Sequence, residues 1–403
     1  MTAIGFGRDL LRPHDGAAAH RVTFVELFFD LVFVFAVTQV SHHLIGSTTA
    51  VGLVQTVILT AAIWWVWVDT AWVTNWLNPE RAWVRGLLIT LMLGGLLMSS
   101  AIPEAFADKG LLFAVSLVVI QLGRGAFTVL AFARRRRDNA INFVRITAWS
   151  AASGVFWIAG ALVSPELRIL VWLIAVAIDF TGPIARFAVP GLGATDTKTW
   201  DVTGEHMSER VSLFIIIALG ESIVVTGSAF SSLPVDFVHL ASFVAAFAGT
   251  VLMWLLYFGH AARRGREFIS NADDRGAVAR AAYTYVPVVV VIGIVLAAVG
   301  DELVLQHPTG HASTSTVLLI TGSSAVYLLG NVLFARAVGG PWLVTHLAGM
   351  VALVGLAPLA AAVVMPDALT LAWLVNGVLF LVVAADELLF RRQHGASDAT
   401  SEV

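Results

Sequence analysis

Twelve long apolar stretches, separated by short polar turns, constrain this chain more than any other feature of its sequence. Each stretch has about the ~20 residues that an α-helix needs to cross a bilayer. Because the bilayer core holds no water, backbone polar groups there must be satisfied within each helix. The sequence therefore predicts an all-α polytopic membrane protein with about twelve transmembrane helices, at residues 22–44, 51–73, 82–102, 110–133, 142–163, 167–189, 208–231, 237–258, 281–299, 315–337, 343–364 and 369–389.

Positive charge is distributed unevenly between the turns. Of the 24 lysine and arginine residues, 21 lie in the N-terminal tail, around the even-numbered turns or in the C-terminal tail. Only Lys109 and Arg168 belong to the other turns, and Arg124 lies inside a stretch. By the positive-inside rule, this asymmetry predicts that both termini are cytoplasmic. The preference for arginine over lysine is typical of a high-GC bacterial genome, so we expect a multi-pass protein of the bacterial plasma membrane.

The two halves of the chain resemble each other weakly. Val129-Leu-Ala-Phe-Ala-Arg134 is matched by Asn331-Val-Leu-Phe-Ala-Arg336, and Trp172-Leu-Ile is matched by Trp373-Leu-Val, in the same order. Six helices per copy would give both copies the same orientation, as in transporters with parallel repeats. Chance similarity between apolar helices is the alternative. The predicted organisation is a cytoplasmic tail, a first six-helix repeat, a cytoplasmic linker, a second six-helix repeat and a cytoplasmic tail, at residues 1–21, 22–190, 191–207, 208–389 and 390–403.

Five ionisable side chains lie inside the apolar stretches and are candidates for an ion path: Asp30, Asp69, Arg124, Asp179 and Glu221. Each costs roughly 2.5–3.5 kcal/mol on insertion scales, so such groups usually face the bundle interior and find partners there. We expect Arg124 to form an ion pair with Asp179 or Glu221. One base cannot neutralise all the deep acids, and a surplus carboxyl would be protonated, bound to a cation or exposed to water. This surplus indicates a proton or cation path, with purely structural pairing as the alternative.

The first apolar stretch begins with two carboxylates on one helix face. Glu26 and Asp30 are four residues apart, and Thr23 with Glu26 matches the capping-box pattern. The capping pattern favours a structural role for Glu26. Asp30 lies one turn deeper among phenylalanines, and both a functional and a structural role stay open for it.

A second charged segment leads into the seventh stretch. It reads Gly204-Glu-His-Met-Ser-Glu-Arg210 and is followed by Leu219-Gly-Glu-Ser222. The glycine before Glu221 permits close backbone approach to that carboxylate, which is the strongest functional candidate in the chain. The side chains of interest in this segment are His206, Glu209, Arg210, Gly220 and Glu221.

Patterns for other chemistries are not found in the sequence. The second segment does not have the His-Glu-x-x-His spacing of zinc enzymes, and there is no glycine-rich phosphate loop. Arginine clusters follow the topology rather than a nucleic-acid groove. We therefore expect no metal, no cofactor, no catalytic residues and no nucleic-acid partner, and the protein is predicted not to be an enzyme.

The segment Glu26-Leu-Phe-Phe-Asp-Leu-Val-Phe-Val-Phe35 resembles the first-span signature of the bacterial low temperature requirement protein A family. The segment from His206 to Ser222 resembles the second hallmark of this family, and Pro287 to Gly300 resembles a third. The resemblance covers nearly the whole chain. It implies a link to growth in the cold and no particular reaction. Acidic residues usual at the end of the second span are reduced here to Asp69. The hallmark positions that the resemblance implies are Glu26, Asp30, His206, Glu209, Arg210, Gly220 and Glu221.

The leading functional hypothesis is an ion-coupled secondary transporter. Asp30 and Glu221 would bind or relay the coupling ion, and Asp69, Arg124 and Asp179 would complete the path. The partners would be the lipid bilayer and a small ion or solute. A cation channel is one alternative. A non-transporting membrane protein that supports lipid or envelope adaptation to cold is another.

Overall fold

The computed structural model describes residues 10–12, 22–133, 136–195, 204–261, 280–364 and 366–401. Within these residues the regular elements are helices, and no β-strand forms. The chain divides into two compact units. The first comprises Met1–Ile217 and Ile269–Tyr285, and the second comprises Ala218–Phe268 and Val286–Val403. The predicted repeat limits of 22–190 and 208–389 stay a prediction.

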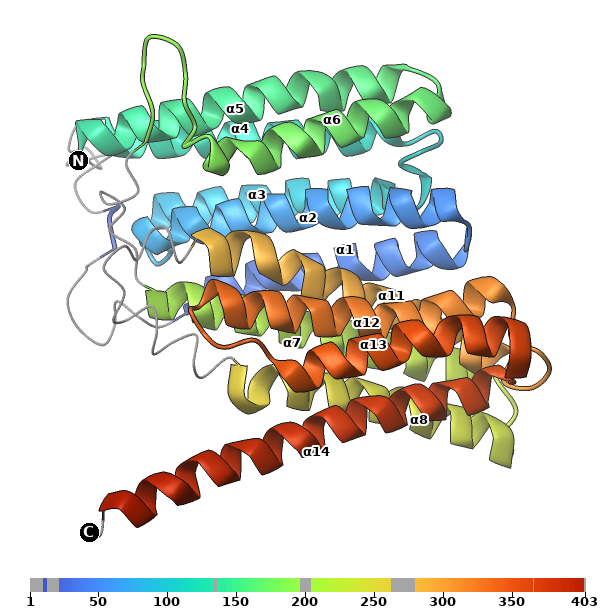
Figure 1. Cartoon of the computed structure of the whole chain (residues 1–403). Helices are drawn as coiled ribbons and strands as arrows, with labels where there is room; N and C mark the ends of the chain where they lie inside the picture. The colour runs from blue at the N-terminus through green and yellow to red at the C-terminus, as the bar shows by residue number, and fades with distance from the viewer. Residues whose placement is uncertain are drawn as a thin grey trace. The chain divides into compact units, whose positions relative to one another are not determined.

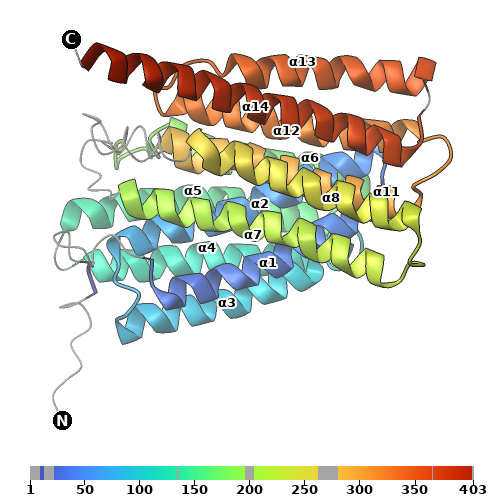
Figure 2. The same ribbon diagram turned by 90° about the horizontal axis from the view of Figure 1, so that it is seen from below.

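The first unit is built from consecutive antiparallel helices joined by short turns (Figure 1). Helix α1 contacts α2 and α3. Helix α3 packs on α4, α4 on α5, and α5 on α6. Figure 2 shows α1 against α3. The elements are α1 (Phe24–Ile45), α2 (Ala50–Trp76), α3 (Ala82–Ala101), η2 (Ile102–Glu104), α4 (Gly110–Phe132), α5 (Arg137–Leu162), α6 (Pro165–Ile184), the first part of α7 (Gly204–Ser231) and the π-helical turn η5 (Arg280–Tyr285).

Helix α2 is the most buried helix of the first unit. In its most apolar window, 72% of the residues are buried, against 44% for α1. Its tryptophans pack inside the unit rather than against lipid, and two of their indole nitrogens are satisfied by η5. Trp64 Nε1 donates to the Thr284 carbonyl at 2.7 Å, and Trp72 Nε1 donates to Thr284 Oγ1 at 2.9 Å. Buried indole N–H groups usually find such partners, so these bonds fix η5 against α2.

The second unit packs its helices around a close pair, α11 and α12. Helix α12 also contacts α13 and α14, and α14 packs on α8 and α13 (Figure 2). The elements are the second part of α7, α8 (Phe237–Leu256), η4 (Tyr257–Ala261), α11 (Val286–Gln306), α12 (Thr314–Ala337), α13 (Val344–Leu359), η6 (Ala360–Val364) and α14 (Ala368–Ser401).

Glycines allow α11 and α12 to approach closely. A Cβ at Gly293 would lie 2.8 Å from the backbone nitrogen of Tyr327, and one at Gly330 would lie 2.9 Å from that of Val290. Small residues at such crossings are typical of helix pairs in membranes, where close van der Waals packing replaces the hydrophobic effect.

Eleven helices among the described residues are long and apolar enough to cross a membrane. Helix α5 is not one of them; its first turns carry Arg137, Asp138 and Arg145, and its apolar part also holds several small polar residues. It nevertheless covers all but the last residue of the predicted stretch 142–163 and packs between α4 and α6. The prediction of an all-α polytopic membrane protein with about twelve transmembrane helices is confirmed.

The α11–α12 crossing yields a matched prediction on one helix. Gly330→Ala places a methyl group 2.6 Å from Val290 Cγ2, whereas a Cβ at Gly322 meets no atom within 4 Å. We expect Gly330→Ala to destabilise the protein by about 1–3 kcal/mol through overpacking. Gly322→Ala should be neutral or stabilising, because alanine is the better helix former. Melting temperatures in detergent check this, and equal values for the two variants would contradict the close crossing.

Candidate functional site

Charged residues from both sequence motifs meet in the first unit. We call Arg12, Glu26, Asp30, His206 and Arg210 the Glu26 cluster; each of these side chains is at most 5% exposed. Helix α1 presents its two carboxylates on one face, since they are one turn apart. Helix α7 presents the histidine and the arginine with the same spacing. The four-residue spacing on both helices therefore places Glu26 and Asp30 of α1 opposite His206 and Arg210 of α7.

Glu26 accepts hydrogen bonds at both carboxylate oxygens. Oε1 accepts from His206 Nε2 at 3.0 Å and from Arg210 Nη1 at 3.1 Å. Oε2 accepts from Arg12 Nη2 at 3.1 Å and from the backbone nitrogen of Thr23 at 2.9 Å. The bond to Thr23 is the one that the capping-box pattern predicts. Glu26 thus caps α1 and also binds two guanidinium groups.

Arg210 connects the two motif carboxylates. Its Nη2 donates to Asp30 Oδ1 at 2.7 Å, and the same oxygen accepts from Trp67 Nε1 at 2.7 Å. The guanidinium carbon of Arg210 lies 5.5 Å from the centroid of the Trp67 ring, so the indole also contributes a cation–π contact. Charge-assisted bonds in this geometry are stronger than neutral ones and orient both partners.

The charges of the Glu26 cluster balance. Two carboxylates face the guanidinium groups of Arg12 and Arg210. His206 is neutral in this arrangement, because Nε2 donates to Glu26 while Nδ1 accepts from Asn75 Nδ2 at 3.3 Å. Breaking such a buried pair leaves an uncompensated charge, which is costly. The cluster therefore has the properties of a fixed clamp between α1, α2 and α7.

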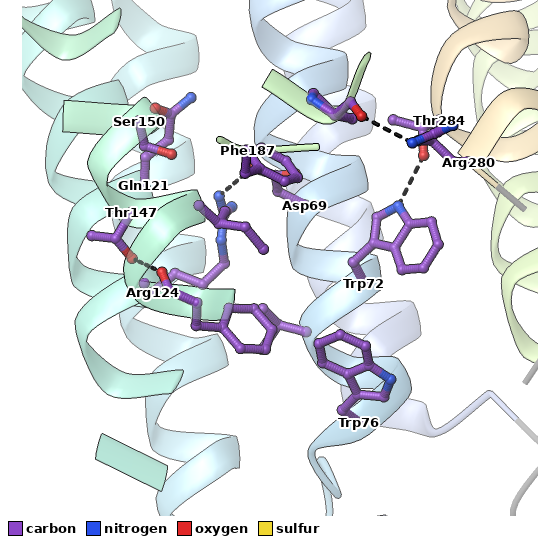
Figure 3. A pocket seen from close by; sticks show the side chains of 15 residues that line it. Asp69, Trp72, Trp76, Gln121, Arg124, Thr147, Ser150, Phe187, Arg280 and Thr284 are labelled. Atoms are coloured by element: carbon purple, nitrogen blue, oxygen red, sulfur yellow. Dashed lines mark hydrogen bonds and ion pairs between the residues drawn. The ribbon is translucent and has the colours of Figure 1, made fainter. Parts of the chain in front are cut away.

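The partner of Arg124 differs from the prediction. We expected Asp179 or Glu221, but Arg124 Nη2 donates to Asp69 Oδ2 at 2.9 Å (Figure 3). Its Nη1 donates to Thr70 Oγ1 and to the Val66 carbonyl, both at 3.0 Å. One turn of α2 therefore offers a carboxylate, a hydroxyl and a carbonyl to the same guanidinium. The expected pairing with Asp179 was wrong, since helix packing rather than depth decides the partner.

Asp179 instead has neutral donors. Its Oδ2 accepts from Trp157 Nε1 at 3.1 Å, from the neighbouring helix α5. It forms no ion pair among the described residues. A small cavity of about 40 Å³ adjoins the Asp69–Arg124 pair, enough for a few water molecules. Figure 3 shows the Gln121 and Ser150 side chains at this cavity.

The second unit contains a carboxylate that the sequence analysis missed. Asp301 lies in α11, and its Oδ2 accepts a hydrogen bond from Ser222 Oγ at 3.3 Å. The predicted stretch 281–299 ended before Asp301, whereas α11 continues to Gln306. The pair Gly300-Asp301 parallels Gly220-Glu221, and this repeated glycine–acid pattern could have indicated the site.

Glu221 belongs to the same unit and is 1% exposed. It precedes Ser222, whose hydroxyl lies 3.1 Å from Thr250 Oγ1 and also reaches Asp301. The space beside Gly220 is open, since a Cβ there would meet no atom within 4 Å. Glu209 is exposed and accepts a long bond, 3.4 Å, from the Val22 backbone.

Across the described ranges, no group of three histidine, cysteine or acidic side chains has the arrangement of a metal site. Buried ion pairs, intramembrane carboxyls and eleven apolar helices define a polytopic membrane protein with an ionisable interior. The family model of the bacterial low temperature requirement A protein (LtrA) matches residues 21–384. The chain belongs to this family, and the resemblance noted in the sequence is confirmed.

One curated relative is similar over most of its length. The uncharacterized protein RA0937 of Rhizobium meliloti (strain 1021) is 39% identical over 320 residues, which cover 78% of this chain and 77% of the relative. No solved structure matches the chain.

The clamp predicts a large difference between two neighbouring residues. Arg210→Gln leaves two buried carboxylates with one guanidinium, and we expect a loss of about 3–5 kcal/mol in the free energy of unfolding. Glu209→Gln changes an exposed side chain on the same helix and should cost little. Melting temperature and the monodisperse fraction in size-exclusion chromatography measure both variants. Equal stability of the two would show that the cluster is not a clamp.

The pairing of Arg124 predicts an order of stability. Asp69→Asn removes the ionic partner of a buried guanidinium, whereas Asp179→Asn removes a carboxyl that only neutral groups contact. We therefore expect a clearly lower melting temperature for Asp69→Asn than for Asp179→Asn. The reverse order would mean that Arg124 pairs with Asp179 in the folded protein.

Proposed function

We propose that the protein is an ion-coupled secondary transporter of the bacterial plasma membrane, with both termini in the cytoplasm. One observation carries the proposal: Asp301 lies in a membrane-spanning helix and has no cationic partner among the residues that the structure describes. Ion pairs of the second unit form at His239–Asp236, His346–Asp386 and Arg391–Glu387, and Asp301 takes part in none of them. Asp301 accepts a hydrogen bond from the neutral hydroxyl group of Ser222.

A carboxyl in this setting has few stable states. An ionised, unpaired carboxylate in an apolar interior is strongly disfavoured, so the group is protonated, binds a cation or opens to water. Alternation between such states is what couples ion movement to a conformational cycle in secondary transporters, whose ion sites lie near the middle of the membrane. Intramembrane ionisable groups commonly mark ion paths for this reason.

The Glu26 cluster supports the proposal by contrast. Its carboxylates are neutralised by Arg12 and Arg210, so neither needs an external ion. We therefore assign Asp30 to the clamp and place the ion path at Asp301. Glu221 keeps its proposed role, since it is buried in the same unit next to the serine that contacts Asp301. Asp179, also without an ionic partner, is a further candidate in the first unit.

Flux into proteoliposomes tests the function. Purified protein is reconstituted, and H⁺, Na⁺ and K⁺ gradients are imposed in turn. We expect flux from the wild type, and we expect Asp301→Asn and Glu221→Gln to reduce it to the level of empty liposomes. Glu302→Gln is the matched control, because Glu302 neighbours Asp301 on α11 but bonds to Gln306 at 2.7 Å.

The outcomes separate the rival functions. Flux that persists in both Asp301→Asn and Glu221→Gln would remove these two carboxyls from the path. An ohmic conductance without coupling would identify a cation channel. If folded wild-type protein gives no flux of any ion, and a deletion strain has an altered lipid profile, the protein has a non-transporting role in the envelope.

A further inference from the structure

A small cavity in the second unit is lined by oxygen-bearing side chains from four helices. Its volume is about 30 Å³, and α8, α11, α12 and α14 all contribute to its wall. The other lining residues are apolar or glycine. The polar residues are Thr250, Asp301, Ser323, Ser324 and Asn376.

Two hydroxyl groups of this lining donate to the backbone of their own helices. Thr250 Oγ1 donates to the Ala246 carbonyl at 3.2 Å, and Ser323 Oγ donates to the Ile320 carbonyl at 3.1 Å. A hydroxyl has one hydrogen and two lone pairs. Ser323 Oγ therefore keeps its lone pairs for a ligand, and Thr250 Oγ1, which also lies 3.1 Å from Ser222 Oγ, keeps at least one.

The amide of Asn376 is oriented in the same sense. Its Nδ2 donates to the Ala245 carbonyl at 2.8 Å, which leaves Oδ1 on the opposite side. Gly249 makes room for this oxygen, since a Cβ at Gly249 would lie 3.0 Å from Oδ1. The cavity therefore presents acceptors, and carboxylate, carbonyl and hydroxyl oxygens are the ligands that hard cations prefer.

We propose that this cavity binds one dehydrated sodium ion, with Asp301 as its charged ligand and the oxygens of Thr250, Ser323, Ser324 and Asn376 around it. Since one water molecule needs about 10–15 Å³ of such space, a cavity of about 30 Å³ has room for a single ion with most of its hydration shell removed. One carboxylate neutralises one monovalent charge, whereas a divalent ion would leave net charge in the membrane interior. A carboxylate among few oxygens gives a strong ligand field, which favours sodium over potassium.

This inference rests on the proposed transport function and names its coupling ion. Ser222 links the site to α7, because its hydroxyl reaches both Thr250 and Asp301. Sodium binding would therefore act directly on the helix that carries Glu221.

The test is direct sodium binding to the purified full-length protein in detergent. Radioactive sodium binding and sodium-dependent thermal stabilisation are measured at constant ionic strength, with potassium and choline as replacement ions. We expect saturable binding of one sodium per chain, weak competition by potassium and loss of binding in Asp301→Asn. Glu302→Gln should bind like the wild type.

A glycine pair guards against misfolding of the charge variant. Gly249→Ala keeps the charge of Asp301 but crowds Asn376 Oδ1. It should therefore weaken sodium binding. Gly227→Ala is its control, because a Cβ there meets no atom within 4 Å. Size-exclusion profiles confirm that each variant is folded before binding is compared.

The outcomes distinguish the site from the function. Sodium binding without flux would keep the site and overturn the transporter. Proton-driven flux from a protein that binds no sodium would keep the transporter and overturn the site. Sodium binding that is unchanged in both Asp301→Asn and Gly249→Ala would also overturn the site.

Discussion

The contact of Arg210 with both motif carboxylates is the interaction on which the first unit depends. One guanidinium group donates to Glu26 and to Asp30, while Trp67 closes the arrangement from α2. Three helices are thereby fixed by charge-assisted bonds in a medium where the hydrophobic effect does not hold helices together. The cost of burying these charges is offset only while all partners are present. This requirement gives a physical reason for the two motifs to occur together in one chain.

The two units handle charge in different ways. In the first, the guanidinium groups of Arg12, Arg210 and Arg124 face acidic partners on neighbouring helices. In the described part of the second unit, the membrane-spanning residue Asp301 has no such basic partner. A balanced cluster stabilises one conformation, whereas an unbalanced carboxyl needs a proton or a cation that comes and goes. The proposed transport function follows from this difference, with the Glu26 cluster as a scaffold, Asp301 as the main ion-handling group and Asp179 as a further candidate in the first unit.

The sequence predicts the helices well because a bilayer permits few alternatives: apolar length determines where a chain can cross. It also predicts the cap at Glu26, since capping depends on residues that are close along the chain. The partner of Arg124 could not be predicted in this way. Depth in the membrane favoured Asp179 or Glu221 over the shallower Asp69, and only the packing of α2 beside α4 makes Asp69 the partner. Asp301 was missed because α11 extends beyond its most apolar segment, so hydropathy alone ended the helix too early.

Infrared difference spectroscopy during exchange of potassium for sodium is the measurement that separates a structural clamp from an ion site most directly. The purified protein is compared with Asp30→Asn and Asp301→Asn. If the Glu26 cluster is a clamp and the second unit handles the ion, a carboxyl band should change on sodium addition in the wild type and in Asp30→Asn, and this change should vanish in Asp301→Asn. A band that persists in Asp301→Asn but vanishes in Asp30→Asn would place the ion at the motif cluster and contradict this division of roles.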